Sequence, residues 1–319
     1  MSVLVSILIP AHHSALTIRA ALESCMAQTY RHIEIIVLNT GSTDHTSEVV
    51  RDMKDERIQL HENADNKGIA AARNQLLKLA KGEFIAWLDA DDEMMPERIE
   101  RQLAYFEEYP ETDIAGTWIK TDNDELPERK LPLSHNEIYH YLWFKNCMIQ
   151  PSIMSRNFYS KEGIFYDESF ANIAEDYELW YRLRDKKHFA NIPEFLTLYH
   201  ITNGAELERK KKAGNFDVNL NTLWQKKWEA VKTDFNDKQK SSFIRFLYNN
   251  DDLDTETAKD LRQILHQLKK ENNVAFFQLI LKYHHLRLWR NMQVSQKLLY
   301  CYDLRYLSCW SDFKKHFLI

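Results

Sequence analysis

Three carboxylates crowd into four residues of the chain, at Asp89-Ala90-Asp91-Asp92. Such a group repels itself strongly unless a cation neutralises it. Carboxylate oxygens suit Mg²⁺ or Mn²⁺, and these ions commonly bridge protein carboxylates to phosphate oxygens. The cluster therefore predicts a divalent-cation site for a phosphate-bearing ligand. The alternative is a solvated turn whose acids cap a following helix.

A second acidic pair, Glu175-Asp176, begins a segment with apolar residues at helical spacing. A carboxylate acts as a general base when it lies within reach of the proton that it removes. Acids in the first turn of a helix also favour the helix dipole, while Leu179, Trp180 and Leu183 would pack as core. From the residues alone both interpretations stay open.

The first hundred residues alternate apolar, β-branched runs with segments whose apolar residues recur at helical spacing. Continuously apolar runs are typical of strands buried on both faces, so this order predicts a parallel, doubly wound sheet. Strands are expected over residues 3–9, 33–38, 58–61 and 83–88. Helices are expected over residues 18–26, 42–53 and 69–80, the last with Lys81-Gly82 as its C-terminal cap.

The residues that follow these strands lie at the carboxyl ends, where parallel sheets bind ligands. Besides the acidic cluster they are Pro10, Ala11 and His12 after the first strand, and Asn39, Thr40 and Gly41 after the second. Asn66 and Gly68 belong to a loop that could cover a ligand. Arg73, at the start of the third helix, could reach a diphosphate or form a structural ion pair.

The pattern changes near residue 204, beyond which glycine and proline nearly vanish and helical periodicity prevails. Before that point, helices are expected over residues 96–109 and 175–184, strands over 114–120, 150–154 and 194–199, and a loop over 121–135. We therefore expect an α/β domain over residues 1–205, with halves at 1–100 and 101–205, and a helical extension over residues 206–319.

The composition is that of an ordinary globular chain, with 44% hydrophobic and 28% charged residues. A net charge of −5 gives no global basic field for nucleic acid. The apolar start of the chain is too short for a membrane span and lacks a signal-peptide pattern, and no stretch of about 20 apolar residues follows. Four cysteines without metal-ligand or disulfide-framework spacing fit reduced thiols in a cytoplasmic protein.

Four stretches of the sequence resemble the inverting glycosyltransferase family 2, whose members have the GT-A fold. They are Val5-Ser6-Ile7-Leu8-Ile9-Pro10, Gln28-Thr29-Tyr30 with residues 34–38 and Gly41-Ser42-Thr43-Asp44, Asn66-Lys67-Gly68 with Ala71-Ala72-Arg73-Asn74, and residues 80–98. The resemblance spans roughly residues 3–205. It implies a catalytic domain whose residues 1–100 form the donor half, for the nucleotide-sugar and the metal, and whose residues 101–205 form the acceptor half. It implies an α/β, GT-A fold, Rossmann-like, with a mostly parallel sheet flanked by helices. It also implies a nucleotide-sugar donor, a UDP-sugar, with Mn²⁺ or Mg²⁺ as cofactor.

The resemblance gives the acidic cluster specific roles. Asp91 is implied as the main metal-contacting carboxylate, and Asp89 as a contact of the metal and of the donor sugar or ribose. Ala90 joins the donor contacts and Asp92 supports the site. Tyr199-His200 ends a strand where the family often has Tyr-Arg or Tyr-His. His200 either completes the metal shell, contacts the diphosphate or is a loop histidine.

For the second acidic pair the resemblance favours catalysis. Asp176 takes the position of the general base and Glu175 that of its neighbour. A base must lie opposite the leaving diphosphate, and therefore on a different segment from the metal motif. The implied reaction is inverting transfer to a saccharide acceptor in the synthesis of a bacterial surface polysaccharide or lipooligosaccharide.

The sequence departs from the family pattern at two places in the nucleotide half. His12-His13 replaces Tyr-Asn, and the His12 ring could lie against a base or be part of a surface loop. Asn39-Thr40 replaces two aspartates, one of which commonly accepts the uracil N3 proton in related enzymes. Neutral oxygens accept more weakly than a carboxylate, so a weaker uridine contact is expected.

Residues 277–319 combine bulky apolar and aromatic residues with a positive charge. The basic residues are Lys282, Arg287, Arg290, Lys297, Arg305, Lys314 and Lys315, opposed by Asp303 and Asp312. Such a segment suits an anionic membrane surface, where a lipid-linked acceptor would lie. The protein would then be peripheral on the inner face of the cell membrane. A packing domain or a homodimer interface is the alternative.

Two other functions stay open. A nucleotidyltransferase can share a similar sheet and metal site, but it usually has a Gly-rich, basic loop after the first strand, and residues 10–14 are neither. A sugar-nucleotide-binding module without activity is the other alternative, and Thr40 favours it because it stands where the family usually has an aspartate. The presence of Asp89, Asp91 and Asp176 argues against it.

Overall fold

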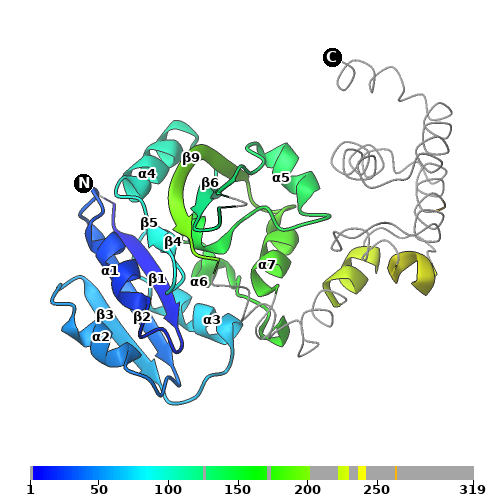
Figure 1. Cartoon of the computed structure of the whole chain (residues 1–319). Helices are drawn as coiled ribbons and strands as arrows, with labels where there is room; N and C mark the ends of the chain where they lie inside the picture. The colour runs from blue at the N-terminus through cyan, green and yellow to red at the C-terminus, as the bar shows by residue number, and fades with distance from the viewer. Residues whose placement is uncertain are drawn as a thin grey trace. The chain divides into compact units, whose positions relative to one another are not determined.

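The computed structural model describes residues 3–124, 127–170, 174–201, 222–229, 236–241 and 263. Contacts divide the chain into two units, Met1–Leu223 and Trp224–Ile319, and the sheet belongs to the first (Figure 1). The boundary expected near residue 205 falls outside the described residues, so the division at 205 and the extension over 206–319 stay predictions. Within the described part of the chain, no helix is long and apolar enough to cross a membrane.

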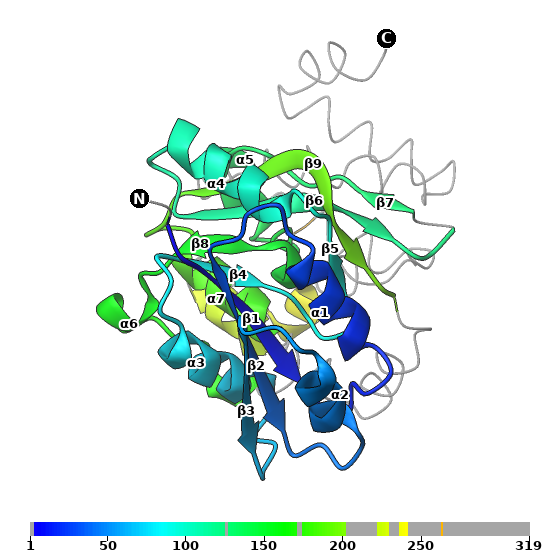
Figure 2. The ribbon, with the colours of Figure 1, turned by 90° about the vertical axis from the view of Figure 1, so that its left-hand side faces the viewer.

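Four parallel strands form the first half of the sheet, in the order β3-β2-β1-β4. They are β1 (Val5–Ala11), β2 (Ile33–Thr40), β3 (Ile58–Asn63) and β4 (Phe84–Trp87). The helices between them are α1 (Ile18–Met26), α2 (Thr46–Asp52) and α3 (Ile69–Leu79). Figure 2 shows α3 on one side of these strands and α1 and α2 on the other. The predicted doubly wound arrangement is confirmed in this half.

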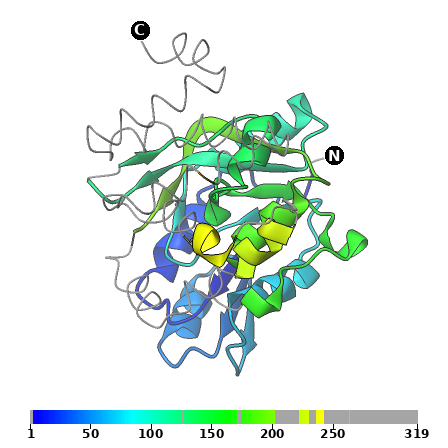
Figure 3. The ribbon, with the colours of Figure 1, turned by 90° about the vertical axis from the view of Figure 1, so that its right-hand side faces the viewer.

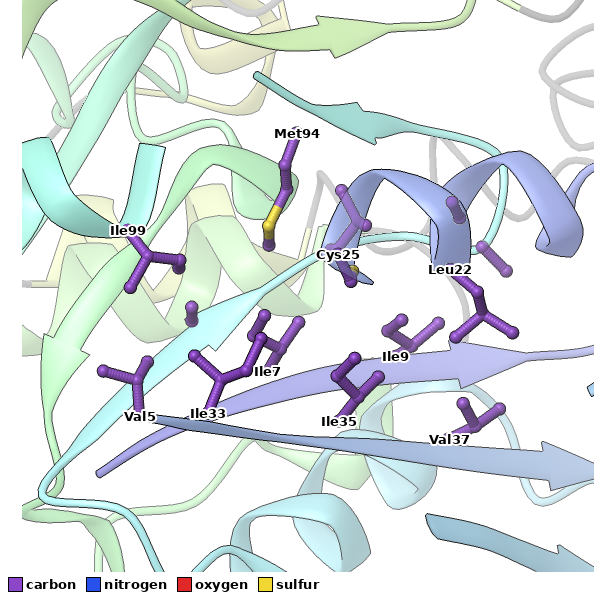
Figure 4. Close-up of a cluster of buried hydrophobic side chains, with 14 of the residues drawn as sticks. Val5, Ile7, Ile9, Leu22, Cys25, Ile33, Ile35, Val37, Met94 and Ile99 are labelled. Atoms are coloured by element: carbon purple, nitrogen blue, oxygen red, sulfur yellow. The ribbon is translucent and has the colours of Figure 1, made fainter. Parts of the chain in front are cut away.

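The apolar strands are buried because helices cover them. Every residue of β1 and β2 is buried. Ile7, Ile9 and Ile35 form one cluster with Leu22 and Cys25 of α1 (Figure 4), while α3 packs against the same two strands. Burial of each large aliphatic side chain contributes about 1.5–3 kcal/mol, so this core holds the strand ends in place.

The second half of the sheet is mixed, and it continues from β4 in the order β8-β6-β9-β5. Its strands are β5 (Glu93–Met94), β6 (Ile114–Thr121), β7 (Glu128–Arg129), β8 (Met154–Arg156) and β9 (Phe189–Tyr199). β8 runs antiparallel to β4 and β6, whereas the long β9 runs parallel to β6 (Figure 3). The helices are α4 (Arg98–Glu108), α5 (His135–Tyr141), α6 (Tyr159–Glu162) and α7 (Glu175–Leu183).

Three local predictions are wrong. The strand expected over residues 150–154 begins only at Met154, as β8: a 3-10 helix covers Gln150–Ser152, because Pro151 has no N–H for a sheet ladder. The loop expected over residues 121–135 contains the short strand β7 and the start of α5. Gly82 does not cap α3, which ends before an extended Ala80. It passes β1 so closely that a β-carbon would lie 2.6 Å from the Ser6 nitrogen.

Candidate functional site

The acidic cluster forms the turn between β4 and β5, and the pairing of β5 with β9 brings the end of β9 beside it. Asp92 is buried, and its Oδ1 accepts a hydrogen bond of 2.8 Å from the His200 backbone. Among the described residues, its Oδ2 has no hydrogen-bond partner. Burial, and then the charges of Asp89 and Asp91, raises the pKa of Asp92 to about 9.

His200 lies at the predicted place, but carboxylates surround its ring. Nε2 is 3.0 Å from Glu93 and Nδ1 is 3.1 Å from Asp122. Burial opposes the charge of this ring, yet the bonds to Glu93 and Asp122 raise its pKa. A metal bond would displace one of these carboxylates, and the role of His200 as a metal ligand stays a prediction.

Arg73 joins the two acidic motifs. It lies in α3 with 4% of its surface exposed, and one guanidinium nitrogen is 3.1 Å from Asp89 Oδ1. Another nitrogen pairs with Glu175. Burial opposes its charge, but Glu175 and Asp89 outweigh burial and raise the pKa of Arg73. The ion pair considered from sequence is therefore present, and it spans segments about a hundred residues apart.

The guanidinium of Arg73 also contacts two aromatic rings. It lies 5.9 Å from the centre of the Trp87 ring and 5.7 Å from that of Tyr166. Arginine is attracted to ring faces at such distances, and the planar ion is held in one orientation. Arg73 thus forms a fixed positive centre between the acidic cluster and the start of α7.

Asp176 lies in the first turn of α7, after Ala174, whose φ of 64° is left-handed. One carboxylate oxygen accepts 2.9 Å from the Asn146 side chain, and the other accepts 2.7 Å from the Tyr177 backbone. Burial, and then the charge of Glu175, raises the pKa of Asp176 to about 7, although the positive charge of Arg73 opposes this rise. A carboxylate that titrates near neutrality is matched to general-base work.

A pocket of about 360 Å³ opens at the ends of β2 and β3 and the start of α3. Thr40 and Gly68 are the predicted donor-binding residues among its lining. The lining residues are Thr40, Glu62, Asn63, Ala64, Asp65, Lys67, Gly68, Ala71, Ala72 and Gln75.

Two positions beside the pocket, Gly41 and Gly68, have backbone conformations that favour glycine. Gly41 has a left-handed φ of 60°, and a β-carbon there would lie 3.1 Å from both Ala64 O and Asn66 N. Gly68 has φ 93° at the start of α3, and its nitrogen donates to the Asn66 side chain. Both glycines are therefore required by the backbone of this loop.

The other donor-half candidates lie at the strand ends as predicted. The exposed His12 ring has Nδ1 2.6 Å from the Thr40 carbonyl oxygen. The Asn39 amide is buried, donates to Ser47 and accepts from Ser42. Asn39 therefore braces the loop after β2. Pro10 and Ala11 end β1, where both are buried.

The acidic turn fits a hard divalent cation by its chemistry. Among the described residues, no three His, Cys, Asp or Glu side chains already form a metal cage. Mg²⁺ and similar ions, however, are commonly bound through one or two carboxylates together with substrate phosphates. Asp89 and Asp91 are partly exposed next to the buried, unpartnered Asp92 oxygen. These two acids would hold the ion.

Sequence reasoning missed three residues of the site. Asn63 and Gln75 exchange two side-chain hydrogen bonds in the pocket wall. Asn146 contacts Asp176 from the loop after α5. A single asparagine or glutamine without a repeated spacing carries no readable signal, since only the folded chain shows what it faces.

Comparison with known proteins now fixes the family. Residues 6–171 match the family described as glycosyl transferase family 2. The chain belongs to glycosyltransferase family 2. It is 33% identical over 215 residues to the Escherichia coli UDP-Glc:alpha-D-GlcNAc-diphosphoundecaprenol beta-1,3-glucosyltransferase WfaP, covering 65% of this chain and 81% of the relative. It is 31% identical over 220 residues to an uncharacterized glycosyltransferase of Methanocaldococcus jannaschii, covering 66% and 75%.

Solved structures confirm the fold. Staphylococcus aureus TarS matches with a TM-score of 0.56 and 17% identity, over 82% of this chain and 78% of that chain. A mannosyltransferase from Pyrobaculum calidifontis matches with a TM-score of 0.55 and 16% identity, over 94% and 86%. These structures show the GT-A-like α/β fold. The family match and the named relatives show a glycosyltransferase, and the nucleotidyltransferase alternative is set aside.

Proposed function

We propose that this family 2 enzyme transfers a sugar, with inversion and with a divalent cation, from a UDP-sugar to a saccharide acceptor. One observation carries the proposal. The side chain of Arg73 contacts Asp89 of the acidic turn and Glu175 beside Asp176. A candidate metal motif and a candidate base therefore belong to one site, as transfer chemistry requires.

The two sides of this site have different tasks. The pocket beside Thr40 receives the nucleobase, and Asp89 and Asp91 hold Mn²⁺ or Mg²⁺. When bound, the ion neutralises the charge of the departing diphosphate. Asp176 accepts the proton of the acceptor hydroxyl as that oxygen bonds to the anomeric carbon. On the opposite face, the bond between the anomeric carbon and the diphosphate oxygen breaks. The electron pair of this bond leaves with the nucleoside diphosphate, and the configuration at the carbon inverts.

UDP is the preferred nucleotide on two grounds. The E. coli relative is named for UDP-Glc, and TarS has been solved with UDP and with UDP-GlcNAc. The Pyrobaculum enzyme, solved with GDP-Man and Mn²⁺, shows that this fold also accepts guanine. Thr40 lines the pocket and has no carboxylate to offer, so a modest affinity for uracil is expected.

The acceptor is proposed to be a lipid-linked saccharide of bacterial surface polysaccharide or lipooligosaccharide synthesis. The E. coli relative is named for a diphosphoundecaprenol-linked acceptor. The basic segment 277–319, which lies outside the described residues, would hold the protein on the inner face of the cell membrane; a homodimer contact is its alternative role. Full-length protein should sediment with anionic vesicles at low salt, and protein without the segment should not.

A thermal-shift screen of nucleotide-sugars, each with and without Mn²⁺, tests the proposed donor and cation together. Ligand binding to the native state raises the unfolding midpoint by mass action. We expect a UDP-sugar to stabilise the protein, and more so with Mn²⁺. Equal stabilisation with and without Mn²⁺ would refute the metal dependence, and a larger shift with GDP-sugars would refute the uridine preference.

A further inference from the structure

The carboxylate of Asp176 is held from outside its own helix by one side chain. Nδ2 of Asn146 lies 2.9 Å from Asp176 Oδ2. The amide oxygen of the same asparagine accepts a 3.0 Å hydrogen bond from the Met148 backbone nitrogen. Since that nitrogen can only donate, the oxygen of the Asn146 amide must face it and the NH₂ group must face Asp176. The loop after α5 thus fixes the orientation of the amide.

We infer that Asn146 is a positioning residue for Asp176, orienting the carboxylate and stabilising its charged form. The inference rests on the proposed function, in which Asp176 is the general base. A donor to an ionised carboxylate favours that form, and such charge-assisted bonds are stronger than neutral ones. The base must be ionised to accept a proton, so this amide would keep it in its working form.

Asn146 shares the stabilisation of the charged form of Asp176 with the Arg73 charge and the Tyr177 backbone. The charges of Glu175 and Asp89 oppose ionisation of Asp176, and Tyr166 is close enough to interact with it. Arg73 favours ionisation, but its guanidinium pairs with Glu175 and Asp89. In the described part of the chain, the hydrogen bonds to the Asp176 carboxylate come from Asn146 and from the Tyr177 backbone.

The direct test is a titration of Asp176 in the full-length protein labelled with ¹³Cγ-aspartate. The Asp176→Asn variant identifies the signal by its loss. We expect the wild-type midpoint near 7, and in Asn146→Ala a midpoint higher by roughly 1 pH unit, since a donor to the charged form is lost. Asn146→Asp keeps an acceptor for Met148 and replaces the donor by a second carboxylate, so it should raise the midpoint further.

Asn157→Ala is the matched control. Asn157 is also partly buried and donates its amide to a backbone carbonyl, that of Gly82. This variant should leave the Asp176 midpoint unchanged. A wild-type midpoint in both Asn146→Ala and Asn146→Asp would overturn the inference.

Kinetics separate this inference from the proposed function. With the nucleotide-sugar selected by the thermal screen, the acidic limb of the kcat profile should move with the midpoint of Asp176. If the signal shifts in Asn146→Ala while the kcat profile does not, the contact is confirmed and the assignment of Asp176 as base fails. If neither shifts, Asn146 does not position this carboxylate.

Discussion

The two halves of the catalytic unit place their site residues in different ways. In residues 3–88, parallel strands buried by helices on both sides end at one edge, and the residues after β1, β2 and β4 meet there. In residues 93–201 the sheet is mixed, and Asp176 comes from the first turn of a helix. The first half follows a general rule for parallel sheets. The second half depends on individual contacts, and Arg73 ties the two together.

Removal of the candidate base should show most clearly that the two halves have different tasks, because it should affect turnover and not nucleotide binding. Asp176→Asn is expected to lower kcat by about 10²–10⁴-fold, the range for loss of acid–base catalysis, with nucleotide binding unchanged. Steady-state kinetics and calorimetry measure the two quantities. Asp185→Asn, an exposed acid just beyond α7, is the control. Near-normal turnover by Asp176→Asn would remove the assignment.

Breaking the link between the halves should cost stability. Arg73→Ala leaves Glu175 buried and Asp89 without its partner, and loss of one member of a buried ion pair costs about 3–5 kcal/mol. Urea unfolding measures this change. Arg51→Ala breaks an exposed pair with Glu62 and should cost about 0–1 kcal/mol. Similar losses in the two variants would show that the buried link contributes no more than a surface pair.

Damage to the donor half alone should spare the base. Asp91→Ala is expected to weaken donor binding in the presence of Mn²⁺ by about 100-fold, the equivalent of about 2.8 kcal/mol of metal-mediated contact. Isothermal calorimetry with and without Mn²⁺ measures it. Asp52→Ala, an exposed acid at the end of α2, is the control. Unchanged affinity in Asp91→Ala would refute its role.

Substitutions at two glycines compare the stability cost of a close packing contact with that of a left-handed backbone conformation. A β-carbon at Gly82 would meet backbone atoms of Ser6 and Leu4 at 2.6 and 2.8 Å, so Gly82→Ala should destabilise the protein by about 1–3 kcal/mol. Gly163 has open space but a φ of 66°, and Gly163→Ala should cost about 1–2 kcal/mol. Thermal unfolding ranks them. An unchanged stability of Gly82→Ala would mean that the backbone of β1 shifts to make room for the β-carbon.

The pH dependence should report the acceptor half alone. Asp176 has a pKa of about 7 and must be ionised to act, so kcat should rise with pH and level off above that value. Between pH 6 and pH 8 the expected increase is about tenfold at saturating donor and Mn²⁺. Calorimetry over the same range checks that donor binding is constant. A flat kcat profile would contradict the raised pKa or the role.

The success of prediction differed between the halves for physical reasons. Helix α1 has the predicted bounds, Ile18–Met26, because its apolar spacing matches the core that covers it. The strand expected over residues 150–154 was wrong at its start, because Gln150–Ser152 form a 3-10 helix and Pro151 cannot donate to a sheet ladder. Gly82 was predicted to cap a helix. The structure shows instead that a glycine is needed there because β1 passes too close for a β-carbon.

By itself the sequence determined the family, the parallel first half and the acids that end β4, since these depend on local periodicity and on the order of elements. Only the tertiary structure decided that Arg73 pairs with both Asp89 and Glu175, and that Asn146 faces Asp176. The raised pKa of Asp176 was likewise decided only by the tertiary structure. Each of these depends on burial and on distances between segments far apart in the chain, and local sequence patterns do not encode such distances.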